Sequence, residues 1–181
     1  ALREATRLRM VRADVPVGCY LSGGLDSSVV AALGREFAGD RFHTFSIRFA
    51  DAEYDESEHQ DRMVAHLGSE HHAITVTRRD VADVLPAVIA HAEKPILRTG
   101  PAPLFLLSKL VRDTGVKVVL TGEGADEMFA GYDLFREGKV RRFWARHPGS
   151  ALRPRLLDRL YPYLARSPVA QRAMARKFFG K

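Results

Sequence analysis

Short apolar segments alternate with amphipathic helical segments along most of the chain. Four short segments predict strands: the apolar runs 17–21 and 116–120, and residues 43–49 and 71–76, in which apolar and polar residues are mixed. Between them, apolar residues recur at helical spacing, over residues 26–37, 57–67, 78–92 and 101–114. This alternation predicts an α/β protein with a doubly wound parallel sheet, covered by helices on both faces.

The two ends of the chain do not follow this alternation. Residues 1–13 are polar and predict an N-terminal helix that ends before Pro16, since proline disfavours helical conformation in the preceding residue. The last quarter is rich in arginine and proline. Its leucines lie at helical spacing: Leu152, Leu156, Leu157, Leu160 and Leu164. We therefore divide the chain into this helix, an α/β core at 14–135 and a basic helical segment at 136–181.

The composition is that of a folded protein, because 46% of the 181 residues are hydrophobic and 28% are charged. No apolar run approaches the roughly 20 residues of a membrane span, and the first residues lack the apolar region of a signal peptide. The single cysteine, Cys19, excludes an intramolecular disulfide, and its place in a strand predicts a small buried residue. These features together favour a cytoplasmic protein.

The formal net charge of +6 is unevenly distributed. Residues 136–181 contain 13 lysines and arginines and two acids, whereas residues 1–135 contain 15 basic and 20 acidic residues. Basic residues bind nucleic-acid phosphates, so an RNA-binding module is one interpretation of the last segment. Because the segment lacks interleaved exposed aromatic residues and its leucines predict packing, we do not expect a nucleic-acid partner.

A glycine turn joins the first predicted strand to the following helix, and it reads Ser22-Gly-Gly-Leu-Asp-Ser-Ser28. Free N–H groups at a helix N-terminus bind anions, and the two glycines allow close approach of the backbone. The turn lacks the lysine of a Walker loop. Asp26 alone is explained by helix capping, but beside phosphates its carboxylate requires a hard cation such as Mg²⁺. The whole motif therefore predicts a site for a metal–nucleotide complex.

A second glycine loop follows the last predicted strand, and it reads Leu120-Thr-Gly-Glu-Gly-Ala-Asp-Glu127. The tripeptide Ala130-Gly-Tyr132 follows closely. The three carboxylates of this loop repel one another unless cations are present. A turn with solvated acids is the alternative for this loop alone. Because ligands bind at the carboxyl ends of parallel strands, we expect both loops to face one site.

The motifs SGGLDSS, TGEGADE and AGY together resemble those of the synthetase domain of glutamine-hydrolysing asparagine synthetases, over roughly residues 1–140. SGGLDSS itself resembles the PP-loop of the ATP pyrophosphatase superfamily. The resemblance implies a PP-loop fold and a carbon–nitrogen ligase that uses ATP and Mg²⁺. Such a ligase adenylates the side-chain carboxylate of aspartate for attack by glutamine-derived ammonia, giving asparagine. A related synthetase for another carboxylate, or a tRNA-modifying PP-loop protein, is the alternative.

The resemblance also implies roles for residues of the two loops. Asp26 and Asp126 correspond to the aspartates that reach Mg²⁺ in the family. Glu123 corresponds to the catalytic glutamate that helps to form aspartyl-AMP and handles the protons of ammonia, where β-lactam synthetases carry tyrosine. The implied nucleotide contacts are Leu21, Ser22, Gly23, Gly24, Leu25, Asp26, Ser27, Ser28, Ile47, Thr121 and Gly122.

Two parts of the family's proteins are absent from the sequence: the N-terminal glutaminase domain, and the lysine-bearing remainder of the synthetase domain. We therefore expect a fragment whose partners are these two parts, with aspartate and ammonia as substrates. The resemblance is compatible with a homodimer of the full-length protein.

A few other polar residues are weaker candidates. The resemblance implies that the loop with Arg98 and Thr99 lies where the family positions substrate groups, so these two residues are candidates for contacts with aspartate or phosphate. Asp55 and Glu58 precede a helix, and we favour capping over a substrate contact for them.

The seven histidines show no metal-ligand spacing. Adjacent residues of a strand face opposite ways, so we expect one of His71 and His72 to be buried and the other exposed. We expect neither to be a metal ligand.

Overall fold

The computed structural model describes residues 1–160. The chain forms two compact units, Ala1–Glu123 and Gly124–Lys181. No helix within residues 1–160 combines the length and the hydrophobicity needed to cross a bilayer.

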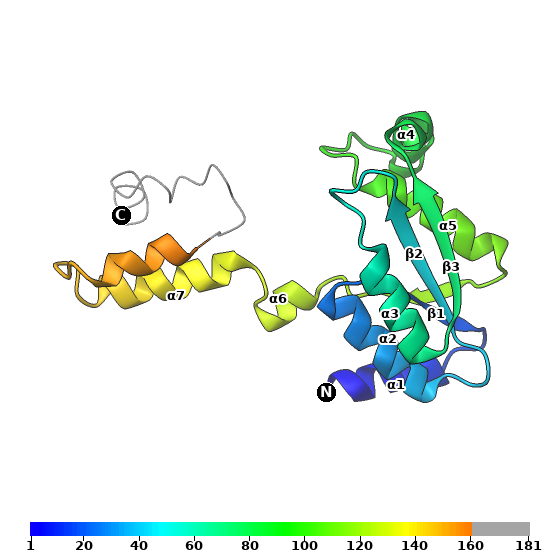
Figure 1. Ribbon diagram of the computed structural model, residues 1–181, viewed down its shortest axis with the longest axis horizontal. Helices are drawn as coiled ribbons and strands as arrows, with labels where there is room; N and C mark the ends of the chain where they lie inside the picture. Colours follow the sequence, from blue (N-terminus) through cyan, green and yellow to red (C-terminus); the bar gives the residue numbers. More distant parts are fainter. Residues whose placement is uncertain (161–181) are drawn as a thin grey trace. The chain divides into compact units, whose positions relative to one another are not determined.

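A parallel sheet of four strands in the order β3-β2-β1-β4 is the centre of the first unit (Figure 1). The strands are β1 (Val17–Tyr20), β2 (His43–Phe49), β3 (Glu70–Val76) and β4 (Val118–Leu120). Cys19 of β1 is the register partner of Thr44 in β2 and of Leu120 in β4. Because every ladder is parallel, all four carboxyl ends lie at one edge of the sheet, as the sequence predicts.

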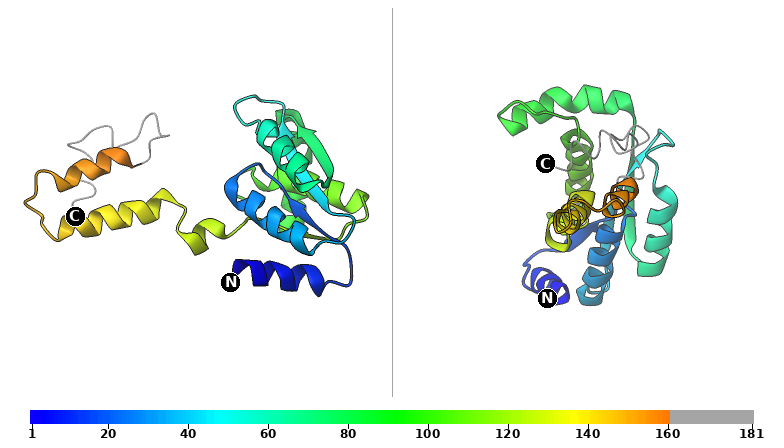
Figure 2. Two further views of the ribbon diagram at one scale, coloured as in Figure 1. Left: turned by 60° about the horizontal axis from the view of Figure 1, so that its bottom comes forward. Right: turned by 90° about the vertical axis from the view of Figure 1, so that its left-hand side faces the viewer.

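Helices cover both faces of this sheet (Figures 1 and 2). On one face pack α2 (Leu25–Phe37) and α3 (Ser57–Leu67), and α1 (Leu2–Val11) lies against α2. On the other face packs α5 (Pro101–Asp113), with α4 (Arg78–Ala92) against it. This arrangement confirms the predicted doubly wound α/β class.

Each face of the sheet has its own apolar core. The core under α2 and α3 is formed by Cys19, Leu21, Ala31, Phe42 and Leu67. The core under α5 is formed by Phe45, Leu107, Val111 and Val116. Cys19 is fully buried, as predicted, and this burial raises the pKa of its thiol to about 12. The cysteine is therefore a neutral packing residue at physiological pH.

The local sequence accounts for two helix ends. α3 is followed by Gly68, whose φ of 57° lies in the left-handed region that glycine adopts most easily. α4 begins with the predicted capping box, in which the Thr77 hydroxyl accepts the Asp80 N–H and the Asp80 carboxylate accepts the Thr77 N–H. Hydrogen bonds from the Thr77 hydroxyl and N–H lower the pKa of the Asp80 carboxyl.

Two predictions about strands are wrong in part. The apolar run 116–120 predicts a five-residue strand that is buried on both faces, but only Val118–Leu120 pair, and Val118 is 40% exposed because β4 is an edge strand. His71 and His72 are both half-buried, rather than one buried and one exposed. β3 forms the other edge of the described sheet, and Val76 is the only buried residue of this strand.

The second unit contains α6 (Ala125–Phe129), α7 (Asp133–Ala145) and the 3₁₀ helix η1 (Arg153–Arg159). Leu157 and Leu160 are buried against Val140 and Trp144 of α7. The predicted helical packing of the leucines is thus confirmed for these two, although the turn is 3₁₀. Two other leucines of the stripe, Leu152 and Leu156, are exposed, and Leu164 lies outside the described residues.

Replacing Leu107 by alanine tests the core under α5. Leu107 is buried, and deleting such a side chain costs about 2–5 kcal/mol, so urea unfolding should move to lower concentrations. Leu97 in the same unit is fully exposed and gives a matched control, because Leu97→Ala should change the free energy of unfolding by less than about 0.5 kcal/mol. Equal losses in the two variants would contradict this description of the core.

Candidate functional site

The loop after β1 is a compact turn closed by its own serines. Ser27 lies in the first turn of α2, and its Oγ accepts the Ser22 N–H at 3.1 Å. The same Oγ donates to the Gly24 carbonyl at 3.2 Å and lies 2.9 Å from the Ser22 Oγ. Gly23 has a φ of 92°, a conformation that favours glycine. The loop therefore turns back directly onto the N-terminus of α2.

α3 supports this turn from the side. A Cβ atom on Gly23 would lie 3.0 Å from the His59 Cβ and 3.3 Å from the Glu56 carbonyl oxygen, so no larger residue fits easily. The buried Gln60 donates from its Nε2 to the Ile47 carbonyl at 2.9 Å and to the Ser22 carbonyl at 3.3 Å. Gln60 thereby links the residues that follow β1 to the carboxyl half of β2.

The sequence patterns do not single out Gln60, although a signal is present. Gln60 lies at i and i+4 spacing from the partly buried Val64, and at i and i+7 spacing from the buried Leu67. A polar residue on the apolar face of a helix needs a hydrogen-bond partner, which points to backbone groups under that helix.

The backbone of the second loop lies against the first loop. A Cβ atom on Gly122 would lie 2.8 Å from the Ser27 nitrogen and 3.1 Å from the Asp26 Cβ. Such an approach is open only to glycine. The Glu123 N–H donates to the Thr121 Oγ1 at 3.3 Å, which shapes the turn that follows. The two loops therefore meet at the carboxyl edge of the sheet, as the topology predicts.

The predicted site residues of the first unit differ in exposure. Leu21 and Ser27 are buried and form the base of the loop, whereas Leu25, Asp26 and Glu123 are exposed. The remaining members of this set are Ser22 and Gly24, which are exposed, and Gly23, Ser28, Ile47, Thr121 and Gly122, which are half-buried. Carboxylate oxygens beside free N–H groups at a helix N-terminus fit Mg²⁺ together with phosphate.

Asp126 belongs to the second unit, where the AGY tripeptide shapes its surroundings. The Gly131 N–H donates to the Asp126 carbonyl at 3.0 Å. A Cβ atom on Gly131 would overlap the Asp126 carboxylate, at 1.9 Å from its Oδ1. The Tyr132 hydroxyl donates to the Glu127 carboxylate at 2.8 Å. Glycine at position 131 thus leaves room for a carboxylate that a larger residue would displace.

The acids before α3 act in different ways. Asp55 accepts the Ser57 N–H at 3.2 Å and the Ser57 hydroxyl at 2.8 Å, which closes a turn just before α3. The N-cap residue is Glu56 and no described side chain caps this end, so the predicted N-cap role of Asp55 is wrong. Glu58 instead forms an ion pair with Arg62, one turn later in the same helix. The predicted capping role of Glu58 is wrong, since its side chain extends along the helix surface.

A cavity of about 730 Å³ opens where β2 and β3 end. Thr99 and Gly100 line it, whereas Arg98 is exposed and is not among its lining residues. The cavity wall also carries an ion pair of 2.5 Å between Arg78 and Asp51, and this pair lowers the pKa of the Asp51 carboxyl. A volume of this size holds a small metabolite or a nucleotide base.

Comparison with known proteins identifies the family. A family model described as asparagine synthase matches residues 1–180.

The chain belongs to the asparagine synthase family.

Two curated members of the asparagine synthase family illustrate the likeness. The chain is 34% identical over 157 residues to glutamine-hydrolysing asparagine synthetase 1 of Bacillus subtilis, covering 87% of this chain and 24% of that protein. It is 39% identical over 132 residues to putative glutamine-hydrolysing asparagine synthetase 2 of Methanocaldococcus jannaschii, covering 72% of this chain and 25% of that protein. The chain thus spans about a quarter of the length of these relatives.

Solved structures with the same fold are NAD synthetases. The glutamine-dependent NAD⁺ synthetase of Acinetobacter baumannii, in complex with ADP, has a TM-score of 0.53 at 20% identity, over 72% of this chain and 26% of that chain. The NH₃-dependent NAD synthetase of Campylobacter jejuni has a TM-score of 0.50 at 19% identity, over 99% of this chain and 93% of that chain. These likenesses show that this member of the asparagine synthase family has the PP-loop ATP pyrophosphatase fold.

Gly122→Ala tests the contact between the two loops. The added Cβ would meet the backbone of Ser27 and Asp26, which cannot move away without shifting α2, so we expect a loss of about 1–3 kcal/mol in the free energy of unfolding. Gly39→Ala is the control, because a Cβ there meets nothing within 4 Å. Thermal and urea unfolding of the two variants measure the difference. An unchanged free energy of unfolding in Gly122→Ala would mean that the loops do not touch.

Proposed function

We propose that this chain is the ATP-binding part of an asparagine synthetase. In this reaction the side-chain carboxylate of aspartate attacks the α-phosphorus of ATP, pyrophosphate leaves, and ammonia derived from glutamine displaces AMP from the activated acyl group. The observation that carries the proposal is the meeting of the SGGLDSS and TGEGADE loops at Gly122, within a member of the asparagine synthase family.

The first loop is suited to hold the departing pyrophosphate. The N–H groups at the N-terminus of α2 and the hydroxyls of Ser22 and Ser28 supply donors, and the helix dipole favours the negative charge that develops on the leaving group. Gly23 and Gly24 keep side chains away from the turn. The backbone contact at Gly122 fixes the second loop beside these donors.

Magnesium is the cation that this donor set favours. Asp26 is exposed in the first turn of α2, and we assign it as one ligand on the geometry of the first unit. Asp126 is assigned as another on the resemblance of its loop to the family motif. When bound, Mg²⁺ would neutralise part of the negative charge on the phosphates.

Glu123 is proposed as the catalytic base. It directly follows the glycine that contacts the first loop, and it is exposed. Ammonia carries protons that must leave once its nitrogen has bonded to the acyl carbon. A carboxylate beside that nitrogen accepts one of them. Leu21, Ile47 and Thr121 are proposed to contact the nucleotide.

The charges of the second unit support this proposal over an RNA-binding one. Among the described residues, Arg136 pairs with Asp133 at 3.1 Å, and Arg141 pairs with Glu137 at 3.3 Å. Arg153 lies over the Phe143 ring, 4.1 Å from its centroid. Guanidinium groups engaged within the unit are less available to nucleic-acid phosphates.

Substitution of the two aspartates tests the metal assignment. Asp26→Ala and Asp126→Ala should each weaken ATP binding about tenfold or more in the presence of Mg²⁺, and leave the weak binding in EDTA unchanged, because only the metal-bound complex loses a ligand. Calorimetric titration with ATP measures both conditions. Asp40→Ala, which alters an exposed acid after α2, should bind as the unaltered chain does. If Mg²⁺ strengthens ATP binding in both aspartate variants as much as in the unaltered chain, the two aspartates are not the metal ligands.

The acceptor is tested on the full-length synthetase. With ATP, Mg²⁺ and ammonia present, we expect pyrophosphate release to require aspartate, since the carboxylate must attack before pyrophosphate leaves. Other carboxylic acids of similar size, glutamate among them, are the controls. Release that depends on one of these acids and not on aspartate would keep the adenylating chemistry and replace the substrate.

A further inference from the structure

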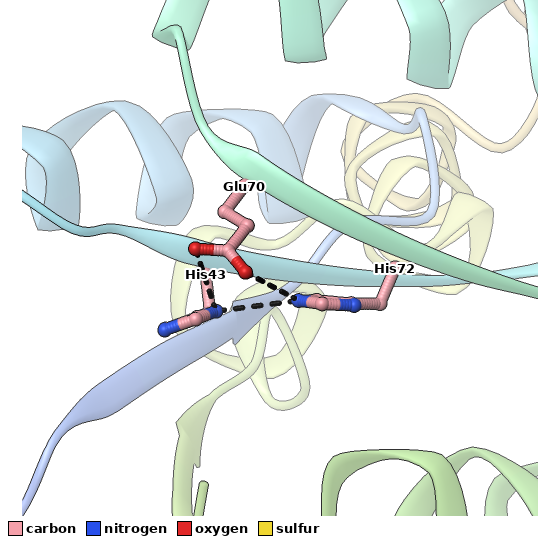
Figure 3. Close-up of side chains that lie close together, drawn as sticks. All are labelled: His43, Glu70 and His72. Carbon is pink, nitrogen blue, oxygen red and sulfur yellow. Dashed lines mark hydrogen bonds and ion pairs between the residues drawn. The ribbon is translucent and has the colours of Figure 1, made fainter. Parts of the chain in front are cut away.

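Three side chains gather at the amino ends of β2 and β3, at the opposite edge of the sheet from the two loops (Figure 3). His43 and Glu70 are the first residues of their strands and are register partners. His72 lies two residues after Glu70, so both point to the same face of β3. The ladder between the two strands therefore fixes the backbone beneath all three side chains.

The spacing of their polar atoms matches a metal coordination sphere. The His43 Nδ1 and the His72 Nε2 lie 3.3 Å apart. The Glu70 Oε2 lies 3.9 Å from the first nitrogen, and the Glu70 Oε1 lies 3.7 Å from the second. One carboxylate oxygen and the two nitrogens all lie within 4.8 Å of one another. In a tetrahedral zinc site with bonds of about 2.0–2.1 Å, neighbouring ligand atoms are separated by about 3.3 Å. The two nitrogens already have this separation, whereas a single carboxylate oxygen would have to move closer to both of them to complete the sphere.

The surroundings hold the rings while leaving one side open. The His72 ring stacks on the His43 ring and on the Phe45 ring, with centroids 5.5 Å and 5.2 Å apart. The side chains of His43 and His72 are 16% and 24% exposed, while that of Glu70 is 53% exposed. An ion can therefore reach the site from solvent and keep a water as its fourth ligand.

We propose that His43, Glu70 and His72 form a binding site for a divalent transition-metal ion of the zinc type. Two imidazole nitrogens and one carboxylate are a donor set that zinc uses, whereas Mg²⁺ prefers oxygen ligands. The ion would join the amino ends of β2 and β3 and stabilise the folded chain, because the ligands converge only in the native sheet. Sequence spacing gives no sign of the site, since its ligands come from two strands.

Zinc binding to the chain in excess Mg²⁺ tests the proposal. The magnesium occupies oxygen-rich sites such as the one proposed at Asp26, so that a chromophoric zinc chelator in competition reports only on other sites. We expect one zinc ion per chain, with affinity about 10- to 100-fold lower in His43→Gln and in His72→Gln, because loss of a ligand weakens binding at least as much as loss of an outer-sphere partner.

His71→Gln is the matched control. His71 is the neighbouring histidine of the same strand, but its Nδ1 lies 3.0 Å from the Thr44 Oγ1 on the other face of the sheet. This variant should bind zinc as the unaltered chain does. Cobalt(II) added in place of zinc should give the intense visible absorption of a four-coordinate ion in the unaltered chain and in this variant only.

Glu70→Gln guards against misfolding, because its half-exposed side chain can be changed with little effect on packing. Circular dichroism checks that each variant is folded. If a histidine variant does not fold, Glu70→Gln replaces it in the test, and this variant should also weaken zinc binding. Zinc affinity that is unchanged in the folded ligand variants, or equally reduced in His71→Gln, would overturn the proposal. The two histidines would then form only a hydrogen-bonded pair.

Discussion

The parallel pairing of β1 with β4 is the constraint on which the candidate ATP site depends. Because Cys19 is the register partner of Leu120, the residues that follow the two strands leave the sheet at the same level. The close approach of Gly122 to the backbone of Ser27 follows from this register. A slip by one residue would turn every side chain of β4 to the opposite face and separate the two loops.

Polar side chains inside the core complete this edge of the sheet. The carbonyls of Leu21 and Ser22 lie where β1 ends and its ladder cannot continue. Ser46 donates to the first of them at 2.5 Å and Gln60 to the second at 3.3 Å. Burying the Gln60 amide leaves its Oε1 without a partner among the described atoms, and such an orphan costs free energy. The hydrogen bonds from Nε2 to the Ile47 and Ser22 carbonyls offset part of that penalty and fix the loop.

The sequence predicts those features that depend on neighbouring residues. β1 is an apolar run, and β2 has apolar residues at every second position, at Phe45, Ile47 and Phe49, so both strands are found almost to the residue. The capping box of α4 lies within four residues and is equally visible. Features that depend on strand pairing cannot be predicted in this way. They are the shortness of β4, the role of Gln60, and the proximity of His43 to His72. These require knowledge of which strands are neighbours and of which strands form the edges.

The two proposed metal sites lie at opposite edges of one sheet and differ in chemical hardness. Carboxylates and phosphate oxygens at the carboxyl edge favour Mg²⁺, whereas imidazoles at the amino edge favour a softer ion. β2 runs between them, from His43 at the amino edge to Ile47, whose carbonyl is held by Gln60 near the loops. An ion that joins β2 to β3 would therefore not compete for ligands with the proposed ATP site at the other end of the strand. Zinc bound at the amino edge should accordingly leave the magnesium requirement for ATP unchanged, because the donor sets do not overlap.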